Sequence, residues 1–347
     1  MNVGVIGCGI IAHNYVDGSD AFPTFDVVAC ADVDTAFASA FAETHGLEAM
    51  GVEELVAADG IDVVLNLTPP AAHFALVAAT LDAGKHSYTE KPLAVSVDAG
   101  RTLVAQSHER DLRVGCAPDT FLGSAYETAR AAIERGDIGV PIGAQAQLLT
   151  GGPEGWHPNA DFFYRQGGGP LLDVGPYYLT AMVSLFGPVA AATGFASTPT
   201  LERELGVGPR AGERFVTEVP THVAATLQFA SGVVGTLTVS FEARGRYESG
   251  MVVHGTEGSL RLPDANAFGG DIRRKNGRGE WEHVEYESRG GMETRGLGLH
   301  DLIESLEAGR PHRASGELAL HVLETMHAVL KAADDGTTVE VSAPVLA

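Results

Sequence analysis

Basic side chains are scarce in this chain of 347 residues, and none precedes Lys85. The first 84 residues hold twelve Asp and Glu residues, and the whole chain has 23 basic against 45 acidic residues, a formal net charge of −22. Nucleic acids and anionic membranes bind basic patches, so neither is an expected partner. No apolar run reaches about 18 residues, so no transmembrane helix is predicted.

Cysteine is also rare, since only Cys8, Cys30 and Cys116 occur, at spacings that match no zinc or redox motif. They lie in apolar runs, so we expect buried and unreactive thiols. The histidines show no ligand spacing, and we predict no catalytic metal. The first residues, MNVGVIGCG, enter a strand without the basic region of a secretory signal, which predicts a cytoplasmic protein.

Up to about residue 118, short β-branched runs alternate with segments of helical periodicity. The expected strands are Val3 to Ile6, Val27 to Ala31, Val63 to Leu67, His86 to Thr89 and Arg113 to Cys116. The expected helices cover residues 10–19, 35–45, 71–83 and 96–110. Strands separated by helices form βαβ units. Residues 1–118 are therefore predicted to form an α/β domain with a doubly wound parallel sheet.

After residue 118 the pattern changes, and residues 119–347 are predicted to form a second domain of the α+β class. Its expected helices cover residues 123–135, a segment ending near 186, and residues 297–308 and 316–333. Alternating runs predict strands over residues 142–150, 189–198, 222–230, 233–243, 250–255, 258–262 and 281–286. This alternation is typical of a mostly antiparallel sheet with one solvated face.

A glycine-rich turn follows the first expected strand and opens the first helix. In Gly7-Cys8-Gly9-Ile10-Ile11-Ala12, the first glycine permits the tight turn and the second lets a pyrophosphate approach the backbone. No cationic side chain is near, so backbone N–H groups and the helix N-terminus would have to hold the phosphates. The predicted contacts are Gly7, Gly9, Ile10 and Ile11.

Asp32 ends the second expected strand, 23 residues after Gly9, where a carboxylate can accept hydrogen bonds from the ribose hydroxyls of a dinucleotide. A carboxylate there repels the 2′-phosphate of NADP, and no basic residue before Lys85 compensates. We therefore predict NAD rather than NADP. Asp34 competes with Asp32 for this role or for that of a helix cap.

A second expected contact with the cofactor comes at the carboxyl end of the third main strand, in Asn66-Leu67-Thr68-Pro69-Pro70. Open α/β sheets bind ligands at this edge. The predicted cofactor contacts here are Leu67, Thr68 and Pro69. His73 follows on the next helix, and from sequence alone it could face the cofactor or lie on the helix surface.

Glu90-Lys91-Pro92 places a lysine and a carboxylate at the end of another strand. Proline restricts the residue before it to an extended conformation. An ammonium group held there could orient a hydroxyl and stabilise the oxygen charge that develops during alcohol oxidation. Glu90 and Lys91 are therefore predicted at the cofactor, although a surface ion pair before a turn is the simpler alternative.

Asp173 and Tyr177 stand four residues apart after a triple glycine in the second domain, so a helical turn would place them on one face. Pro176 fits only a first helical turn, which predicts that the helix starts near Asp173. A carboxylate, a phenol and Lys91 beside a nicotinamide would supply the proton transfer that hydride transfer needs. Capping of the helix is the alternative role for Asp173.

Taken together, these motifs resemble the glucose-fructose oxidoreductase, inositol dehydrogenase and MocA (Gfo/Idh/MocA) family of NAD(P)-dependent oxidoreductases. The resemblance rests on Gly7 to Ala12, Asp32, Thr68-Pro69 with His73, Ala83 to Lys85 leading to Glu90-Lys91-Pro92, Gly136 to Gly139, the triple glycine at 167–169, and Leu171 to Gly187. It implies an N-terminal Rossmann domain and a C-terminal α/β domain with a large open sheet. In relatives the outer face of that sheet often makes the dimer or tetramer contact.

The resemblance also implies catalytic roles for Lys91, Asp173 and the residue at position 177. Many relatives have a histidine at that position as the acid/base, whereas this chain has Tyr177, as in the glucose-fructose oxidoreductase branch. A phenol has a pKa near 10 and needs a neighbouring cation to act near neutrality. Lys91 is the expected source of that cation.

Relatives often have Asn and Arg facing the pocket where this chain has Asp119 and Thr120. A carboxylate and a hydroxyl there favour a neutral polyol over an anionic substrate. The loop Glu154 to Arg165 carries Trp156, and an aromatic face with polar neighbours suits a sugar ring. The predicted substrate contacts are Lys91, Asp119, Trp156, His157, Tyr164, Asp173 and Tyr177.

The sequence thus predicts an NAD-dependent dehydrogenase acting on a secondary hydroxyl of a sugar, sugar derivative or cyclitol. Two alternatives stay open. One is a redox-neutral enzyme that cleaves a glycoside or epimerises a sugar through transient oxidation by bound NAD. The other is a non-catalytic regulatory protein that senses a dinucleotide, although Lys91 is present. A homodimer or homotetramer formed through the C-terminal sheet is expected.

Overall fold

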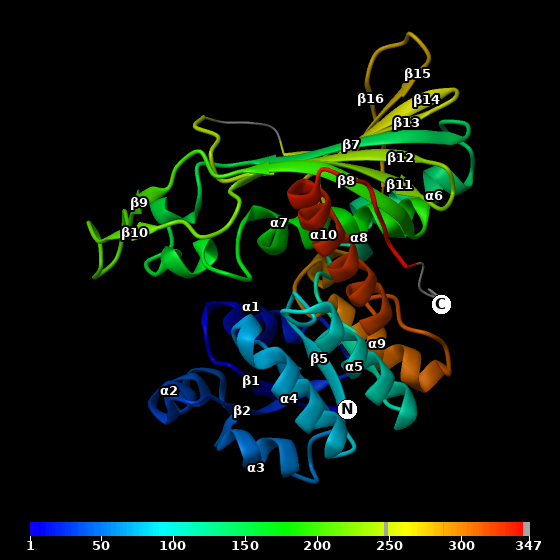
Figure 1. The fold of residues 1–347 in the computed structure, drawn as a ribbon. Helices are drawn as coiled ribbons and strands as arrows, with labels where there is room; N and C mark the ends of the chain where they lie inside the picture. The colour runs from blue at the N-terminus through cyan, green and yellow to red at the C-terminus, as the bar shows by residue number, and fades with distance from the viewer. Residues whose placement is uncertain (246–248, 287, 343–347) are drawn as a thin grey trace. The chain divides into compact units, whose positions relative to one another are not determined.

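The computed structural model in Figure 1 describes residues 1–245, 249–286 and 288–342. The contacts divide the chain into two compact units. Residues 1–123 and 288–323 form the first unit, and among the described residues 124–286 and 324–342 form the second. The first unit is thus completed by a segment from the carboxyl-terminal part of the chain. The division into two consecutive domains, 1–118 and 119–347, stays a prediction.

The first unit contains a parallel sheet of six strands in the order β3-β2-β1-β4-β5-β6. The strands are β1 (Asn2–Ile6), β2 (Asp26–Ala31), β3 (Glu48–Met50), β4 (Val63–Asn66), β5 (His86–Thr89) and β6 (Val114–Cys116). The strand order reverses between β1 and β4, and ligands bind at such a switch point. The predicted doubly wound domain is confirmed.

Helices connect these strands, and the expected ones form within a few residues of their predicted limits. They are α1 (Ile10–Ser19), α2 (Thr35–His45), α4 (Pro70–Asp82) and α5 (Val97–Glu109), and α9 (Leu297–Ala308) belongs to the same unit. Strand β3 and the short helix α3 (Val52–Ala57) were not expected. The three thiols are buried and unbridged, as predicted, and burial raises the pKa of Cys8 to about 12.

Lys85 precedes β5 and is only 8% exposed. Its ammonium donates hydrogen bonds to the carbonyl oxygens of Ala58 (2.6 Å) and Ile61 (2.8 Å), which follow α3. Lys85 thus connects the start of β5 to the segment that follows α3. The sequence did not predict this contact.

We expect Lys85→Met to lower the free energy of unfolding by about 1–3 kcal/mol, because two carbonyl groups lose a charged donor. Urea unfolding followed by circular dichroism measures the loss. Lys331→Met is the control, since Lys331 is exposed and its ion pair is with Asp335, four residues along its helix. Equal unfolding midpoints for the two variants would contradict the assigned role of Lys85.

The second unit contains a nine-stranded sheet in the order β16-β15-β14-β13-β7-β12-β11-β8-β17. Its strands are β7 (Pro141–Leu149), β8 (Val189–Ser197), β11 (His222–Phe229), β12 (Val234–Ser240), β13 (Gly250–Gly255), β14 (Gly258–Leu262), β15 (Arg273–Asn276), β16 (Glu282–His283) and β17 (Val339–Glu340). Only the pair of β7 and β12 is parallel. The predicted mostly antiparallel sheet is confirmed.

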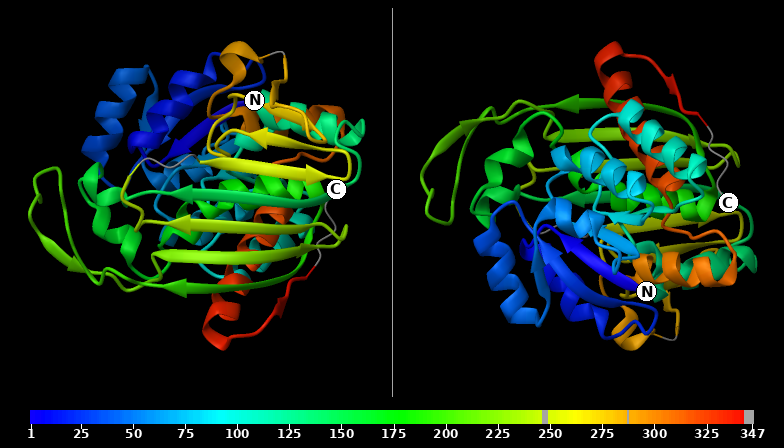
Figure 2. Two further views of the ribbon diagram at one scale, coloured as in Figure 1. Left: turned by 90° about the horizontal axis from the view of Figure 1, so that it is seen from above. Right: turned by 90° about the horizontal axis from the view of Figure 1, so that it is seen from below.

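One face of this sheet carries the core of the second unit. Buried and exposed residues alternate along β11 and β12, as expected for a sheet with one solvated face. Helices α6 (Ser124–Glu134), α7 (Pro170–Asp173) and α8 (Gly175–Phe186) lie along the face that carries the core (Figure 1). In the left view of Figure 2 the strands lie in front of these helices.

Several parts of the second unit differ from expectation. Strands β15 and β17 were not expected. The run 281–286 forms a strand only over Glu282–His283. An unexpected hairpin of β9 (Glu202–Glu204) and β10 (Arg214–Val216) extends beyond the sheet (Figure 1). The segment with Trp156, expected as a loop, contains 3-10 turns over Pro153–Gly155 and Ala160–Tyr164. No helix in the described ranges 1–245, 249–286 and 288–342 is long and apolar enough to span a membrane.

Candidate functional site

The glycine-rich turn leaves room for a phosphate at its second glycine. Gly7 has a φ of +97°, and a Cβ atom there would lie 2.8 Å from the carbonyl carbon of Leu67. Gly9 precedes α1, and a Cβ atom there would meet nothing within 4 Å. The first glycine is thus required by conformation and packing, whereas the second leaves open space beside the backbone. This open space is what a pyrophosphate needs at such a turn.

The start of α1 offers backbone donors to an anion. The first N–H groups of a helix have no partner inside the helix, and those of Ile10 and Ile11 fall in this first turn. No acidic side chain occupies this turn, so none opposes an anion there. Ala12 is fully buried, as close packing of helix and strand requires. These residues fit the phosphates of a dinucleotide.

Asp32 follows β2 and lies against the glycine-rich turn. Its carboxylate accepts hydrogen bonds from the backbone N–H groups of Cys8 (2.9 Å) and Asp34 (2.9 Å). Asp34 itself caps α2, because its side chain accepts from the N–H groups of Ala36 and Phe37. The capping role therefore belongs to Asp34. Asp32 remains half-buried beside the turn, where it can also meet a ribose.

The segment after β4 is held by buried side chains. Asn66 accepts hydrogen bonds from the hydroxyl (2.7 Å) and N–H (3.2 Å) groups of Thr68 and donates to Thr89 (3.1 Å). His73 is fully buried, and its ring nitrogens lie 2.7 Å from the carbonyl oxygen of Pro92 and 2.8 Å from that of Thr68. His73 thus joins two loops inside the unit and does not lie on the helix surface. Within this segment Leu67 is buried and Pro69 precedes α4.

Lys91 lies just beyond the carboxyl end of β5, in a cis peptide bond with Pro92. Its backbone N–H donates to a carboxylate oxygen of Glu90 (3.1 Å), and the other oxygen accepts from the hydroxyl of Tyr15 (3.2 Å). Both Glu90 and Lys91 are half-buried. The first unit therefore places the glycine-rich turn, Asp32 and Lys91 after β1, β2 and β5 of one sheet.

Asp119 is fully buried and satisfied inside the first unit. Its carboxylate lies 3.2 Å from the guanidinium of Arg295 and accepts from the N–H groups of Gly296 (3.1 Å) and Gly298 (3.2 Å). Burial raises the pKa of Asp119, although Arg295 and the N–H of Gly298 oppose the shift. The structure thus gives Asp119 a role in packing. Nothing in the sequence pointed to Arg295, which is 176 residues away.

In the second unit, Asp173 ends α7 and Tyr177 lies in the first turn of α8. Val174 separates the two helices and is the N-cap of α8, so Asp173 does not cap it. Pro176 lies in the first turn, as its geometry requires, and the predicted helix start near Asp173 is confirmed within two residues. Tyr177 is 8% exposed.

The aromatic loop before α7 presents Trp156, which is 67% exposed. Its ring contacts that of His157 edge-on at 5.6 Å, and His157 packs in the same way on Phe163 at 5.4 Å. Burial lowers the pKa of His157, while a hydrogen bond with the backbone of Asn159 and the charge of Asp173 act in the opposite direction. The loop thus brings His157 near Asp173 and leaves the Trp156 ring accessible.

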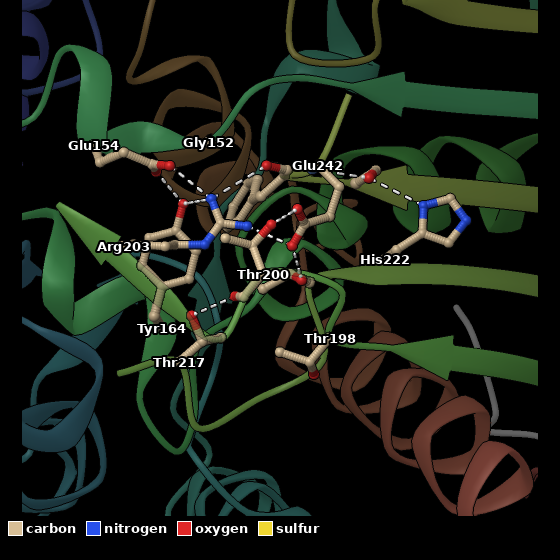
Figure 3. Close-up of polar contacts among 12 residues, drawn as sticks. Gly152, Glu154, Tyr164, Thr198, Thr200, Arg203, Thr217, His222 and Glu242 are labelled. Atoms are coloured by element: carbon tan, nitrogen blue, oxygen red, sulfur yellow. Dashed lines mark hydrogen bonds and ion pairs between the residues drawn. The ribbon is translucent and has the colours of Figure 1, made fainter. Parts of the chain in front are cut away.

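Tyr164 is fully buried in a polar cluster around Arg203 (Figure 3). The Arg203 guanidinium pairs with Glu154 (2.6 Å) and Glu242, and it lies over the Tyr164 ring at 4.6 Å. The Tyr164 hydroxyl donates to Glu154, and burial followed by Glu154 raises its pKa well above the usual value. The cluster joins the aromatic loop, β9 and the end of β12.

A pocket of about 520 Å³ lies beside this cluster and is lined by Glu154, Thr200, Arg203, Phe241, Glu242 and Arg244, among others. Because Tyr164 is fully buried, it contributes to the interior packing of the second unit. The sequence carries no signal for Arg203 or Glu242, because the partners of Arg203 lie 38 or more residues away and Glu242 pairs with Thr221, 21 residues away, and with Arg203. Within the ranges 1–245, 249–286 and 288–342, no group of three or more His, Cys, Asp or Glu residues could hold a metal ion.

Comparisons with known proteins agree with this architecture. Residues 1–117 match the family described as "Oxidoreductase family, NAD-binding Rossmann fold", and residues 126–261 match the GFO/IDH/MocA C-terminal domain. The 1,5-anhydro-D-fructose reductase of Ensifer adhaerens is 29% identical, over 97% of this chain and 98% of that protein. A dTDP-3,4-didehydro-2,6-dideoxy-alpha-D-glucose 3-reductase of Streptomyces antibioticus is 32% identical, over 76% of each chain.

Solved structures show the same fold. A levoglucosan dehydrogenase in complex with NADH and L-sorbose matches with a TM-score of 0.87 at 22% identity, over 99% of both chains. An NAD-binding oxidoreductase from Klebsiella pneumoniae matches with a TM-score of 0.87 at 24% identity, also over 99% of both. At such identities the structural likeness establishes the fold alone. From the family matches and the sequence relatives, the chain belongs to the Gfo/Idh/MocA family of NAD-binding oxidoreductases.

Proposed function

We propose that this oxidoreductase transfers a hydride between nicotinamide and a secondary hydroxyl of a sugar, sugar derivative or cyclitol, with NAD as its cofactor. The observation that carries the proposal is the set of groups after β1, β2 and β5 of one parallel sheet: an open glycine turn, Asp32 and Lys91. The relatives support a carbohydrate, because the first two named above are reductases of a sugar ketone.

Bound NAD supplies the hydride acceptor at its nicotinamide ring. The N–H groups of Gly9, Ile10 and Ile11 are proposed to bind the pyrophosphate, and Asp32 the adenosine ribose. Thr68, Pro69 and Glu90 follow the ends of β4 and β5, which are neighbours in the sheet, and we propose that they also contact the cofactor. Because Leu67 and His73 are buried, we propose that they shape this edge from behind.

On the substrate side, oxidation removes a hydride from the carbon and a proton from its hydroxyl. We propose that Tyr177 accepts this proton, that Lys91 stabilises the charge on the oxygen, and that Asp173 orients the hydroxyl. Trp156 and His157 are the proposed contacts for the sugar ring. Because Asp119 and Tyr164 are fully buried, we propose that they support the site without touching the substrate.

The preference for NAD is tested at Asp32. Asp32→Ser should raise the dissociation constant for NAD about tenfold or more, because a charged acceptor for the ribose is lost. The variant should also discriminate less against NADP, since the repulsion of its 2′-phosphate is removed. Isothermal titration calorimetry with NAD and with NADP measures the two dissociation constants.

Asp34→Asn is the matched control for this test. The amide retains an oxygen that can cap α2, so binding of both cofactors should match that of the wild type. If Asp32→Ser left the ratio of NADP to NAD affinity unchanged, the proposed contact with the ribose would be wrong.

Hydride transfer is tested with NADH that carries deuterium at the transferring position of the nicotinamide. With 1,5-anhydro-D-fructose as the first ketose tried, we expect one deuterium bound to carbon in the product, found by mass spectrometry. A reduced product without deuterium would contradict direct transfer.

We also propose that the chain forms a homodimer or homotetramer through the uncovered face of the nine-stranded sheet. Phe195 on β8 and Val234 on β12 project from this face and are 78% and 47% exposed. Apolar side chains exposed on a sheet often mark an interaction surface. Sedimentation with Phe195→Glu compared with the wild type tests this contact.

A further inference from the structure

Two buried side chains reach the Glu90-Lys91-Pro92 turn from distant parts of the first unit. Tyr15, from α1, contacts Glu90, which precedes Lys91. His73, from α4, contacts Pro92, which follows Lys91. Both side chains are essentially inaccessible, with 1% and 0% of their surface exposed. Neither can therefore contact the sugar, and each needs another explanation.

Tyr15 fixes the carboxylate that precedes the lysine. Its hydroxyl donates to one oxygen of Glu90 (3.2 Å), and the other oxygen accepts the backbone N–H of Lys91 (3.1 Å). With one partner on each oxygen, the carboxylate cannot rotate without losing a hydrogen bond. Burial, followed by the charge of Glu90, raises the pKa of Tyr15 well above its usual value, so the phenol remains a donor.

His73 fixes the residue that follows the lysine. One ring nitrogen lies 2.7 Å from the carbonyl oxygen of Pro92, and the other lies 2.8 Å from that of Thr68. A carbonyl oxygen can only accept, so the ring donates to both only when both nitrogens carry a proton. The imidazole ties the Lys91 turn to the loop after β4.

We propose that Tyr15 and His73 are positioning residues that hold the Lys91 turn from its two sides and so set where the ammonium group lies. The inference rests on the proposed catalytic role of Lys91. Placement of a reacting group matters because a displacement of about 1 Å can cost on the order of 100-fold in rate. The contacts that Tyr15 and His73 make with this turn all lie within the first unit.

Tyr88 provides a matched control for Tyr15. It is also a fully buried tyrosine of the first unit, and its pKa is likewise raised by burial and then by Asp119. Its hydroxyl, however, has no hydrogen-bond partner among the described residues. Tyr88→Phe thus removes the same atom as Tyr15→Phe without breaking a hydrogen bond to the turn.

The test measures the reactivity of the Lys91 amine with trace acetic anhydride over a pH series, by mass spectrometry of peptides. The chain has four lysines, and exposed Lys331 is the internal standard. In Tyr15→Phe and in His73→Gln, we expect the ratio of Lys91 to Lys331 labelling at fixed pH to change about threefold or more, the effect of a half-unit shift in pKa. In Tyr88→Phe the ratio should stay at the wild-type value.

An unchanged ratio in both Tyr15→Phe and His73→Gln would overturn the proposal. If one variant fails to fold, the other decides, and unfolding of both would show that the two residues serve stability instead. The labelling needs no substrate, so it is independent of catalysis. A changed ratio together with an active Lys91→Met enzyme would retain the positioning role and refute the catalytic role of Lys91.

Discussion

Arg203→Met should lower the free energy of unfolding of the second unit by about 3–5 kcal/mol, which is the usual cost of removing one partner from a buried ion pair. The Arg203 side chain is 4% exposed, and those of Glu154 and Glu242 are 19% and 16% exposed. Without the guanidinium, two carboxylates would face each other with little access to water. Methionine keeps much of the volume and removes only the charge and the donors.

The chain offers a selective probe for this measurement. Its two tryptophans, Trp156 and Trp281, both lie in the second unit, so urea unfolding followed by tryptophan fluorescence reports on that unit. Arg214→Met is the control, because Arg214 is 74% exposed and 3.6 Å from Glu204. If both variants had the same midpoint, the cluster around Arg203 would not be a source of stability.

The same cluster predicts how this stability depends on pH. Burial alone would raise the pKa of Glu242, but hydrogen bonds from Thr221 and Thr200 and the charge of Arg203 hold it below the usual value. A carboxyl group whose pKa is lower in the folded state stabilises the fold above its unfolded pKa and loses this contribution as the pH falls through the folded pKa. The stability lost on acidification below about pH 4.5 should therefore be smaller in Arg203→Met than in the wild type.

Lys91→Met should reduce kcat/KM for the active sugar by roughly 100- to 10,000-fold, the range reported for positioned proton-transfer groups and for donors to a developing oxygen charge. The dissociation constant for NAD should change little, because the glycine turn and Asp32 carry the proposed contacts with the phosphates and ribose. Steady-state kinetics and titration with NAD measure the two quantities separately.

Lys331→Met serves as the control for this variant, since it removes an exposed lysine on α10 (Gly316–Asp335) in the second unit. It should retain full turnover. Retention of turnover by Lys91→Met would remove the assigned role of Lys91 and leave the reaction without its proposed source of positive charge.

The sequence predicted the parallel sheet of the first unit and its connecting helices well, because each of these features is local. A β-branched run, a glycine turn and a helical period follow one another within about 30 residues, and the rule for parallel sheets then brings the strand ends to one edge. Asp32 and Lys91 could therefore be assigned to that edge from their places after two strands. The short elements β3 and α3 were not predicted, because three and six residues are too few to show a hydrophobic period.

The buried polar partners were not predictable from one sequence. Asp119 looked like a polar group in a pocket, and only the fold shows that Arg295 and two N–H groups enclose it. Arg203 gave no signal in the sequence, because its partners Glu154 and Glu242 lie 49 and 39 residues away. Such pairings depend on tertiary contacts between distant residues, and spacing along the chain carries no signal for them.

The most direct test of the proposed function is incubation of the pure protein with NAD and a panel of sugars, glycosides and cyclitols. Absorbance of reduced cofactor and product composition by mass spectrometry are followed together. We expect NADH to accumulate in proportion to an oxidised sugar with one member of the panel. Product formed without net NADH would contradict the proposed function in favour of redox-neutral chemistry, and tight NAD binding with no product from any member would favour a regulatory protein.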